Sequence, residues 1–546
     1  MNKGHSLFIS ALVLIWLVML AIVNPIGNFP LNDDWMYSRP VQYLIQHGFY
    51  YSPDYYSPVL CAQVFWGSIF CLPFGFSFTA LRISTLVLGL AGIIVFYLLV
   101  YNFSNNKRIA FLAALLVMVN PLYFSLANTF MTDVPFLAFS FFSVFFYTRY
   151  LQRAQSKFLY LAIALSIIAT LIRQFGVVIP LAYGITLILK NKPKWKGYVS
   201  SFIPAILSAL ALYGALKWLV YIGSPLQPYQ GSTITGLLSQ TGQIANNIYV
   251  RSGDIIYYAG FFLLPLLLVI TVNAITKLSA RQKIGAGVLV LLFLPSLINR
   301  WGCFPIGNVF NDYFIGPKTL RDTTFLHLNN TDGMPSGLLH VFWWLALLGG
   351  LLLLINIGST IATIFKEYRS KELSETSFSW VFVAFFFLGY AFLMFVSDAY
   401  FDRYLLAFIP LSALLIVAGD KKGISVKMPA FIFSAIFIAS LALFSSCATH
   451  DYLEWNRARW KALNYLNKEM KVSPMFIDGG YEYNGWRIGP SSVSFSTDKS
   501  WWFVDDDEYL VTFGPVDGYD YVKPFACNCY LPNGPQNLFI LHRKAK

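Results

Sequence analysis

The chain has 546 residues, of which 57% are hydrophobic and only 12% are charged. This composition, with a mean hydropathy of +0.59, excludes an ordinary soluble enzyme and a disordered chain. The net charge of +13 would also fit a nucleic-acid-binding protein. The Lys and Arg residues lie mostly in short loops between apolar segments, however, where they report membrane topology. We therefore predict a polytopic α-helical membrane protein without a nucleic-acid partner.

Apolar segments long enough to cross a bilayer recur along the chain, because about 20 helical residues span the hydrocarbon core. The first follows a single Lys and has no clear cleavage site, so we interpret it as a signal anchor. About thirteen spans are predicted in all. They cover residues 7–26, 79–101, 109–125, 131–148, 158–172, 175–189, 198–221, 255–275, 284–299, 339–363, 378–397, 404–418 and 428–446.

The basic loops alternate along this series of spans. Clusters at Lys107/Arg108, Arg149/Arg153 and Lys190/Lys192 all fall on one side of the membrane. The positive-inside rule makes that side cytoplasmic. The sequence therefore predicts a multi-pass membrane protein, with a cytoplasmic N-terminus and a C-terminal domain on the outer face.

Three predicted outer segments, residues 27–78, 222–254 and 300–338, are longer than a connection between helices needs. Long structured loops are commonly functional, so the chemistry is expected on the outer face. The first segment should hold two interfacial helices, from about Asp33 to His47 and from about Ser57 to Leu72.

The composition turns polar after residue 446. We predict a transmembrane catalytic region over residues 1–446 and a small α/β domain on the outer face over residues 447–546. In this domain a helix should begin near Asp451. Strands are predicted at residues 475–477, 493–495, 501–504, 509–512 and 537–541.

Adjacent carboxylates, Asp33 and Asp34, follow the first span, and Asp133 opens the fourth. An acid at the edge of a bilayer is costly, and it is usually paired, solvated by a cavity or functional. Because neighbouring residues point in different directions, only one of Asp33 and Asp34 should reach a shared cavity. The structural alternative is that these acids only begin helices, with Asn32 or Asp33 as a cap and Pro135 just inside the second helix.

Basic and aromatic residues stand at the same predicted membrane level. Arg173 ends the fifth span, and Arg403 and Tyr404 begin the twelfth. Guanidinium groups suit bidentate phosphate binding, so we interpret these residues as contacts to a donor phosphate or headgroup, with Lys318 and Arg321 as weaker candidates. Alternatively, the arginines snorkel to lipid headgroups. No side-chain pattern indicates a metal site, and dependence on a divalent metal stays open.

At these positions the chain resembles bacterial members of glycosyltransferase family 39. This family belongs to the GT-C superfamily, with the protein O-mannosyltransferases and the lipid A aminoarabinose transferase. The resemblance covers roughly residues 5–420 and is carried by Asn32-Asp33-Asp34-Trp35, Thr132-Asp133-Val134-Pro135, Arg173-Gln174-Phe175 and Phe401-Asp402-Arg403-Tyr404-Leu405-Leu406 followed by Pro410. It implies a polyprenyl-phosphate sugar donor and catalysis at the outer face. It also implies a catalytic acid at Asp33 or Asp34, with Asp133 as a second acid.

The sequence thus predicts an inverting glycosyltransferase that moves a sugar from polyprenyl phosphate to a lipid, glycan or protein acceptor, in contact with membrane lipid. An acid would take the acceptor proton, and cations would stabilise the departing phosphate. A transporter or flippase of lipid-linked sugars is the main alternative, although transporters usually place polar residues near the membrane midplane. A further alternative is a non-catalytic scaffold that presents the outer tail to a partner.

Overall fold

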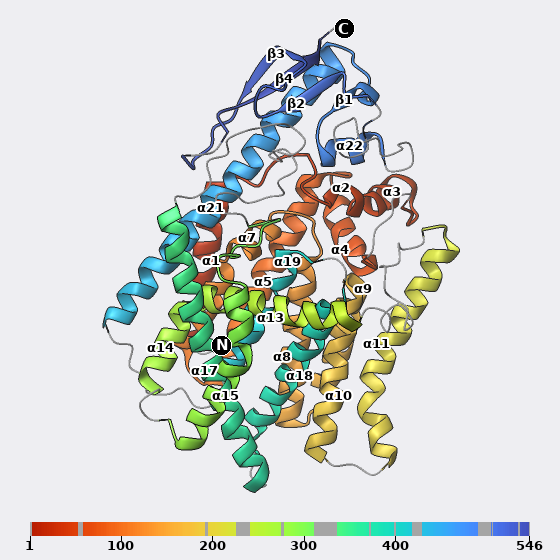
Figure 1. The fold of residues 1–546 in the computed structure, drawn as a ribbon. Helices are drawn as coiled ribbons and strands as arrows, with labels where there is room; N and C mark the ends of the chain where they lie inside the picture. The colour runs from red at the N-terminus through yellow and green to blue at the C-terminus, as the bar shows by residue number, and fades with distance from the viewer. Residues whose placement is uncertain are drawn as a thin grey trace.

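The computed structural model describes residues 3–52, 58–191, 195–224, 241–274, 278–310, 336–370, 373–397, 400–417, 428–489, 504, 506–532 and 535–544. Its helices form a bundle, and a small sheet domain sits at one end of it (Figure 1). We call the end of the bundle next to strands β1 to β4 the sheet end. The N-terminal part of the bundle contains α1 (Lys3–Val23), α2 (Asp34–Tyr37), α3 (Arg39–His47), α4 (Cys61–Cys71), α5 (Phe78–Ser104), α6 (Lys107–Met118), α7 (Pro121–Ala127), α8 (Asp133–Arg153) and α9 (Ser156–Ile172). The later helices are α10 (Val178–Asn191), α11 (Trp195–Tyr221), α13 (Thr241–Phe262), α14 (Leu264–Ala274), α15 (Ala280–Asn299), α17 (Ser336–Ser370), α18 (Glu375–Val396), α19 (Asp402–Leu405), α20 (Phe408–Val417), α21 (Met428–Asn464) and α22 (Tyr481–Arg487).

The polytopic α-helical class is confirmed. Among the described residues, 9 helices are long and apolar enough to cross a membrane, or up to 11 if each bent pair is one span. The bent pairs replace the predicted spans 109–125 and 255–275, with bends of 64° between α6 and α7 and 76° between α13 and α14. Pro121 and Pro265 stand at the breaks, where a residue without a backbone N–H cannot continue the helical hydrogen bonds.

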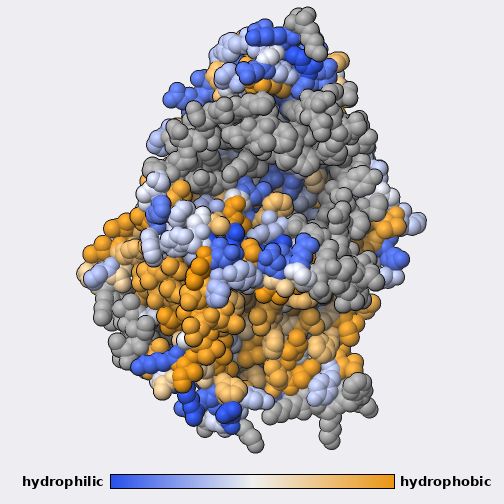
Figure 2. All heavy atoms as spheres, viewed as in Figure 1, coloured by the Kyte–Doolittle hydropathy of each residue, from blue (hydrophilic) through white to orange (hydrophobic). Residues whose placement is uncertain are grey.

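An apolar band covers the lower part of the bundle surface in Figure 2, with hydrophilic residues below and above it. Large apolar side chains of α11, α15 and α17 are exposed, among them Leu210, Leu291 and Trp344, at 59%, 70% and 61% exposure. Apolar surface of this extent would be unusual on a soluble protein. The band is therefore the part of the surface that faces lipid.

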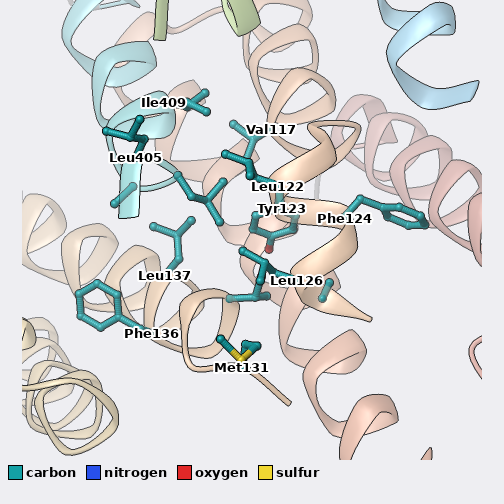
Figure 3. Packing of buried hydrophobic residues seen from close by; sticks show 14 of the residues in the cluster. Val117, Leu122, Tyr123, Phe124, Leu126, Met131, Phe136, Leu137, Leu405 and Ile409 are labelled. Carbon is teal, nitrogen blue, oxygen red and sulfur yellow. The ribbon is translucent and has the colours of Figure 1, made fainter. Parts of the chain in front are cut away.

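The buried core joins the first helices of the bundle to α19 and α20. In Figure 3, side chains of α6, α7 and α8, including Val117 and Leu137, point toward Leu405 and Ile409. Tyr123 adds a buried hydrogen bond from its hydroxyl to the Gly89 carbonyl, at 2.7 Å. This packing brings the start of α8 and the start of α19 together at the sheet end.

The first outer segment differs from its prediction in two respects. The helix expected from Asp33 to His47 is divided into α2 and α3 at Ser38. Gly48 ends α3 in the left-handed conformation, with φ of 77°, as a glycine C-cap allows. The second predicted helix is α4, which begins later than expected, at Cys61.

The C-terminal domain is attached by a helix rather than a linker. α21 runs without interruption from Met428 to Asn464, so the helix predicted near Asp451 is its continuation. The sheet has the order β1-β2-β4-β3, in which β1 (Ile477–Asp478) pairs parallel to β2 (Tyr509–Thr512), and β4 (Asn537–Arg543) is antiparallel to both of its neighbours. β2 and β4 match predicted strands closely. The strand predicted at 475–477 is mostly wrong, because Pro474–Phe476 form a 3-10 helix and β1 shares only Ile477 with it. The predicted strand at 493–495 and most of that at 501–504 lie outside the described residues.

β3 (Tyr519–Ala526) was missed by the sequence analysis. Its Pro524 cannot donate a ladder hydrogen bond, which argues against a strand in the middle of a sheet. β3 lies at the edge of the sheet, where proline is tolerated. Its aromatic and β-branched residues, Tyr519, Tyr521 and Val522, were the available signal.

Candidate active site

The chain between α1 and α2 is fixed by an arginine that the sequence analysis did not single out. Arg82 lies inside α5 and is only 1% exposed. Its guanidinium donates to the carbonyls of Pro25, Gly27 and Phe29 at 2.6, 3.0 and 3.1 Å. A charged residue within a predicted span was the signal that could have identified it. These contacts determine where Asp33 and Asp34 emerge from the bundle.

Asp33 precedes α2 but does not cap it, since its side chain makes no capping hydrogen bond. Its Oδ2 lies 2.9 Å from Nη1 of Arg403, and its Oδ1 accepts a hydrogen bond from the Tyr481 hydroxyl at 2.9 Å. The Tyr37 hydroxyl is 3.4 Å from Oδ2. The interpretation of Asp33 as a helix cap is therefore wrong, because its carboxylate is directed into a cluster of side chains from distant parts of the chain.

Asp34 is turned into the protein and is 2% exposed. Its Oδ1 accepts from the Phe130 amide at 2.8 Å and its Oδ2 from the Leu31 amide at 3.3 Å. Burial raises the pKa of Asp34 to about 8, although Arg82 and these amides lower it. Asp34 thus holds a proton for most of the time at neutral pH and ties α2 to the segment before α8.

Asp133 pairs with Arg173. α8 begins at Asp133, and Thr132 before it makes no side-chain cap, whereas Arg173 directly follows α9. Because α8 and α9 pack as neighbours, Nη1 of Arg173 lies 2.9 Å from Oδ1 of Asp133, with both side chains at least nine-tenths buried. Arg173 and Arg403, at 7% and 8% exposure, do not snorkel to the surface.

Arg403 and Tyr404 are presented by the short helix α19. Asp402 anchors this helix because its carboxylate accepts from the Val309 and Phe310 amides at 3.1 and 2.7 Å. Burial raises the pKa of Asp402 to about 7. Two guanidinium groups lie near the Tyr404 ring, with Arg173 at 5.2 Å and Arg403 at 5.4 Å from its centroid.

A small pocket opens beside this cluster. It is lined by Tyr37, Pro58, Arg173, Gln174, Phe175 and Tyr404. An arginine at the wall of a pocket can hold an anionic group, and an acid next to it can accept a proton. Within the described ranges, no group of three or more His, Cys, Asp or Glu side chains is placed to hold a metal ion.

The structure thus brings together most of the predicted site residues: Asp33, Asp133, Arg173, Arg403 and Tyr404. Asp34 is adjacent but faces the protein interior. Lys318 and Arg321 lie outside the described residues. The sequence analysis assigned no site residue to the C-terminal domain, yet Tyr481 of α22 contacts Asp33 directly.

Comparison with protein families gives a match to part of the chain. A model described as "Dolichyl-phosphate-mannose-protein mannosyltransferase" matches residues 62–221. The predicted resemblance is confirmed over this stretch, which contains Asp133 and Arg173 but neither Asp33 nor Arg403. The match supports a glycosyltransferase that uses a lipid-linked sugar. A search of the curated proteins found no match.

Solved structures show weaker similarity. The archaeal oligosaccharyltransferase AglB from Archaeoglobus fulgidus, in complex with an inhibitory peptide and a dolichol-phosphate, is 15% identical, with a TM-score of 0.42 over 86% of this chain and 58% of that chain. ArnT from Cupriavidus metallidurans bound to undecaprenyl phosphate is 14% identical, with a TM-score of 0.37 over 87% and 82%. Its apo state is 13% identical, with a TM-score of 0.39 over 99% and 98%. At these scores the solved structures add no evidence about the site, and this chain spans little more than half the length of the AglB chain.

Proposed function

We propose that this protein is an inverting glycosyltransferase that moves one sugar from a polyprenyl-phosphate donor to an acceptor hydroxyl. The observation that carries the proposal is the Asp33–Arg403 pair, which lies close to Arg173 and Tyr404 at the wall of a pocket. The pair supplies a proton acceptor and a phosphate-binding cation at one place. The sheet end would face the periplasm of a bacterial inner membrane, with the N-terminus in the cytoplasm.

Asp33 is the proposed base, and the structure favours it over Asp34. Both oxygens of Asp34 accept backbone amides in the interior, and its raised pKa leaves it protonated at neutral pH. The oxygens of Asp33 instead meet a guanidinium and tyrosine hydroxyls. These donors hold the carboxylate in the cluster beside the pocket, where an acceptor hydroxyl could reach it.

Arg403 and Arg173 are the proposed contacts to the donor phosphate. Arg403 already pairs with Asp33, and Arg173 pairs with Asp133. Each guanidinium retains further N–H groups that can donate to a phosphate oxygen. Asp133 would keep Arg173 oriented toward the pocket. The Tyr404 ring, which both guanidinium groups approach, would help to hold them in place.

The proposed reaction is a single displacement at the anomeric carbon. Asp33 accepts the proton of the acceptor hydroxyl as its oxygen forms a bond to that carbon. The bond between the carbon and the phosphate oxygen breaks, and its electron pair leaves on the polyprenyl phosphate. Arg403 and Arg173 stabilise the charge that develops there. Attack from the opposite face inverts the configuration.

The test compares Asp33→Asn with its neighbour Asp34→Asn as a matched control. Membranes of a deletion strain that carry each variant would receive radiolabelled undecaprenyl-phosphate mannose, glucose or aminoarabinose, with transfer followed by mass spectrometry of lipids, glycans and proteins. Asp33→Asn should lower transfer at least about 100-fold, whereas Asp34→Asn and Asp133→Asn should lower it less. Full transfer by Asp33→Asn at equal expression would refute the mechanism.

The transporter alternative predicts a different result. Reconstituted vesicles would then move the labelled carrier across the bilayer without forming a glycosidic bond. The proposed site favours the transferase, because its charged residues gather at one end of the bundle rather than midway along it. Orientation is tested with Ile26→Cys, whose position is 66% exposed. A membrane-impermeant thiol reagent should label it from outside the cytoplasm, against wild-type protein as background.

A further inference from the structure

Helix α22 of the C-terminal domain packs on α2 at the sheet end (Figure 1). We propose that Tyr481, the first residue of α22, is a positioning residue that holds the Asp33 carboxylate in its reactive orientation. The inference rests on the proposed function, because it assigns a task toward the proposed base. It also gives the C-terminal domain a part in the reaction.

Tyr481 and Arg403 hold opposite oxygens of the same carboxylate. The Tyr481 hydroxyl donates to Oδ1 at 2.9 Å, and Arg403 donates to Oδ2 at 2.9 Å. Rotation of the carboxylate would break both contacts. Burial and the charge of Asp33 raise the pKa of Tyr481 well above its usual range, so the phenol keeps its proton and remains a donor.

The position of Tyr481 is set by its neighbour in sequence. Glu482 accepts from the Asn32 amide at 3.0 Å through Oε1, and its Oε2 lies 2.8 Å from Nη1 of Arg459. Both charged side chains of this pair have 0% exposure. Glu482 therefore connects α21, through Arg459, to the residue directly before Asp33. A buried ion pair of this kind fixes a geometry, since removal of either partner leaves the other charge uncompensated.

Two further contacts dock the rest of α22. Gly485 lies against Trp35 so closely that a Cβ there would stand 2.4 Å from Cε2 of the indole. Arg39 donates to the Trp486 carbonyl at 2.5 Å, and its guanidinium lies 3.9 Å from the centroid of the Trp486 ring. The edge of the Trp35 ring system also meets Tyr481, at a centroid distance of 5.8 Å. α22 is thus held against residues 32–39 along its length, and Tyr481 is not a loose contact.

The experiment is a double-mutant cycle between Tyr481→Phe and Asp33→Asn in the full-length protein. Tyr481→Phe removes the donor and keeps the ring against Trp35. The matched control is Tyr483→Phe, because the Tyr483 hydroxyl bonds to Asn467 within the same domain, at 3.1 Å. Transfer from the undecaprenyl-phosphate sugar that is active in the first assay would be measured as kcat and KM. Binding of undecaprenyl phosphate alone would be measured separately.

We expect Tyr481→Phe to lower kcat about tenfold, as the loss of one hydrogen bond to a charged group implies. In Tyr481→Phe, the donor KM and the affinity for undecaprenyl phosphate should stay within twofold of wild type. Its thermal midpoint should stay within one degree of wild type. The control Tyr483→Phe should keep the wild-type kcat. In the Asp33→Asn background, Tyr481→Phe should have no further effect on the residual rate.

The outcomes separate the two proposals. A wild-type kcat in Tyr481→Phe, together with an inactive Asp33→Asn, overturns the positioning role and leaves the proposed base intact. An equal further loss from Tyr481→Phe in the Asp33→Asn background also overturns it, because a merely structural residue would act independently of Asp33. Full activity of Asp33→Asn overturns both proposals.

Discussion

The protonation of Asp34 should make the stability of this protein depend on pH in a characteristic way. Burial raises its pKa from 3.8 to about 8 in the folded protein. Between these values the folded chain holds a proton that the unfolded chain has released, so stability falls as pH rises through this window. The stability that protonated Asp34 contributes to the folded protein is fully present below about pH 4. It is lost as the pH rises to about 8 and above.

The magnitude follows from the two pKa values. Each pH unit within the window changes the free energy of unfolding by about 1.4 kcal/mol, so wild type should lose about 2 to 3 kcal/mol from Asp34 between pH 5 and pH 7. Asp34→Asn cannot titrate, and its amide oxygen can still accept from the Phe130 amide. The difference between the variant and wild type removes the contributions of other groups, including Asp402, whose pKa is also raised.

The assay is the thermal midpoint of tryptophan fluorescence in detergent, recorded for both proteins from pH 5 to pH 8. The midpoint of Asp34→Asn should rise relative to wild type as pH increases, whatever the offset at pH 5. A difference that stays constant from pH 5 to pH 8 would show that Asp34 is ionised throughout this range, as it would be if Arg82 stabilised its anion. That result would refute the assignment of Asp34 as a protonated structural acid.

Three further predictions concern the contacts around the site. Asp133→Ala should destabilise the protein by about 3 to 5 kcal/mol, because it leaves Arg173 buried without its partner. Adding Arg173→Met should restore part of the thermal midpoint, and no recovery would contradict the pairing. Glu482→Gln should leave Arg459 uncompensated and speed the proteolytic release of the C-terminal domain, and unchanged digestion would contradict the docking role. Asp402→Ala should deprive the Val309 and Phe310 amides of their acceptor, which should destabilise the protein by about 1 to 3 kcal/mol for each amide. Hydrogen exchange at residues 309–310 should rise, and unchanged protection would contradict the anchoring role of Asp402.

Much of the fold could be predicted because it depends on local properties of the sequence. Apolar length indicated most of the helices, and Gly48 marked the end of α3. The predictions were less accurate at two kinds of place. Proline, a local signal that the apolar-length criterion did not use, divides two predicted spans into bent pairs. Tertiary packing overrides the local pattern in α21, which continues through the polar boundary at residue 446 because its later turns are covered by the C-terminal domain.

The candidate site was predicted as a set of residue types at one membrane level, without its partners. Asp33 pairs with Arg403 across 370 positions and with Tyr481 across 448 positions. No periodicity connects residues that far apart. The aromatics and acids around Tyr481 gave no sign of a contact with Asp33, whereas the structure turns this stretch toward α2.

The sequence alone therefore determined that the chain lies in a membrane, how its apolar helices follow one another, and which acids and arginines stand at helix ends. These properties follow from the transfer of side chains between water and lipid, which each short segment expresses by itself. Only the tertiary structure decided which of two adjacent acids enters the cluster and that a tyrosine from the last domain holds it. Those choices depend on side-chain direction and on the packing of distant helices, which no local segment encodes.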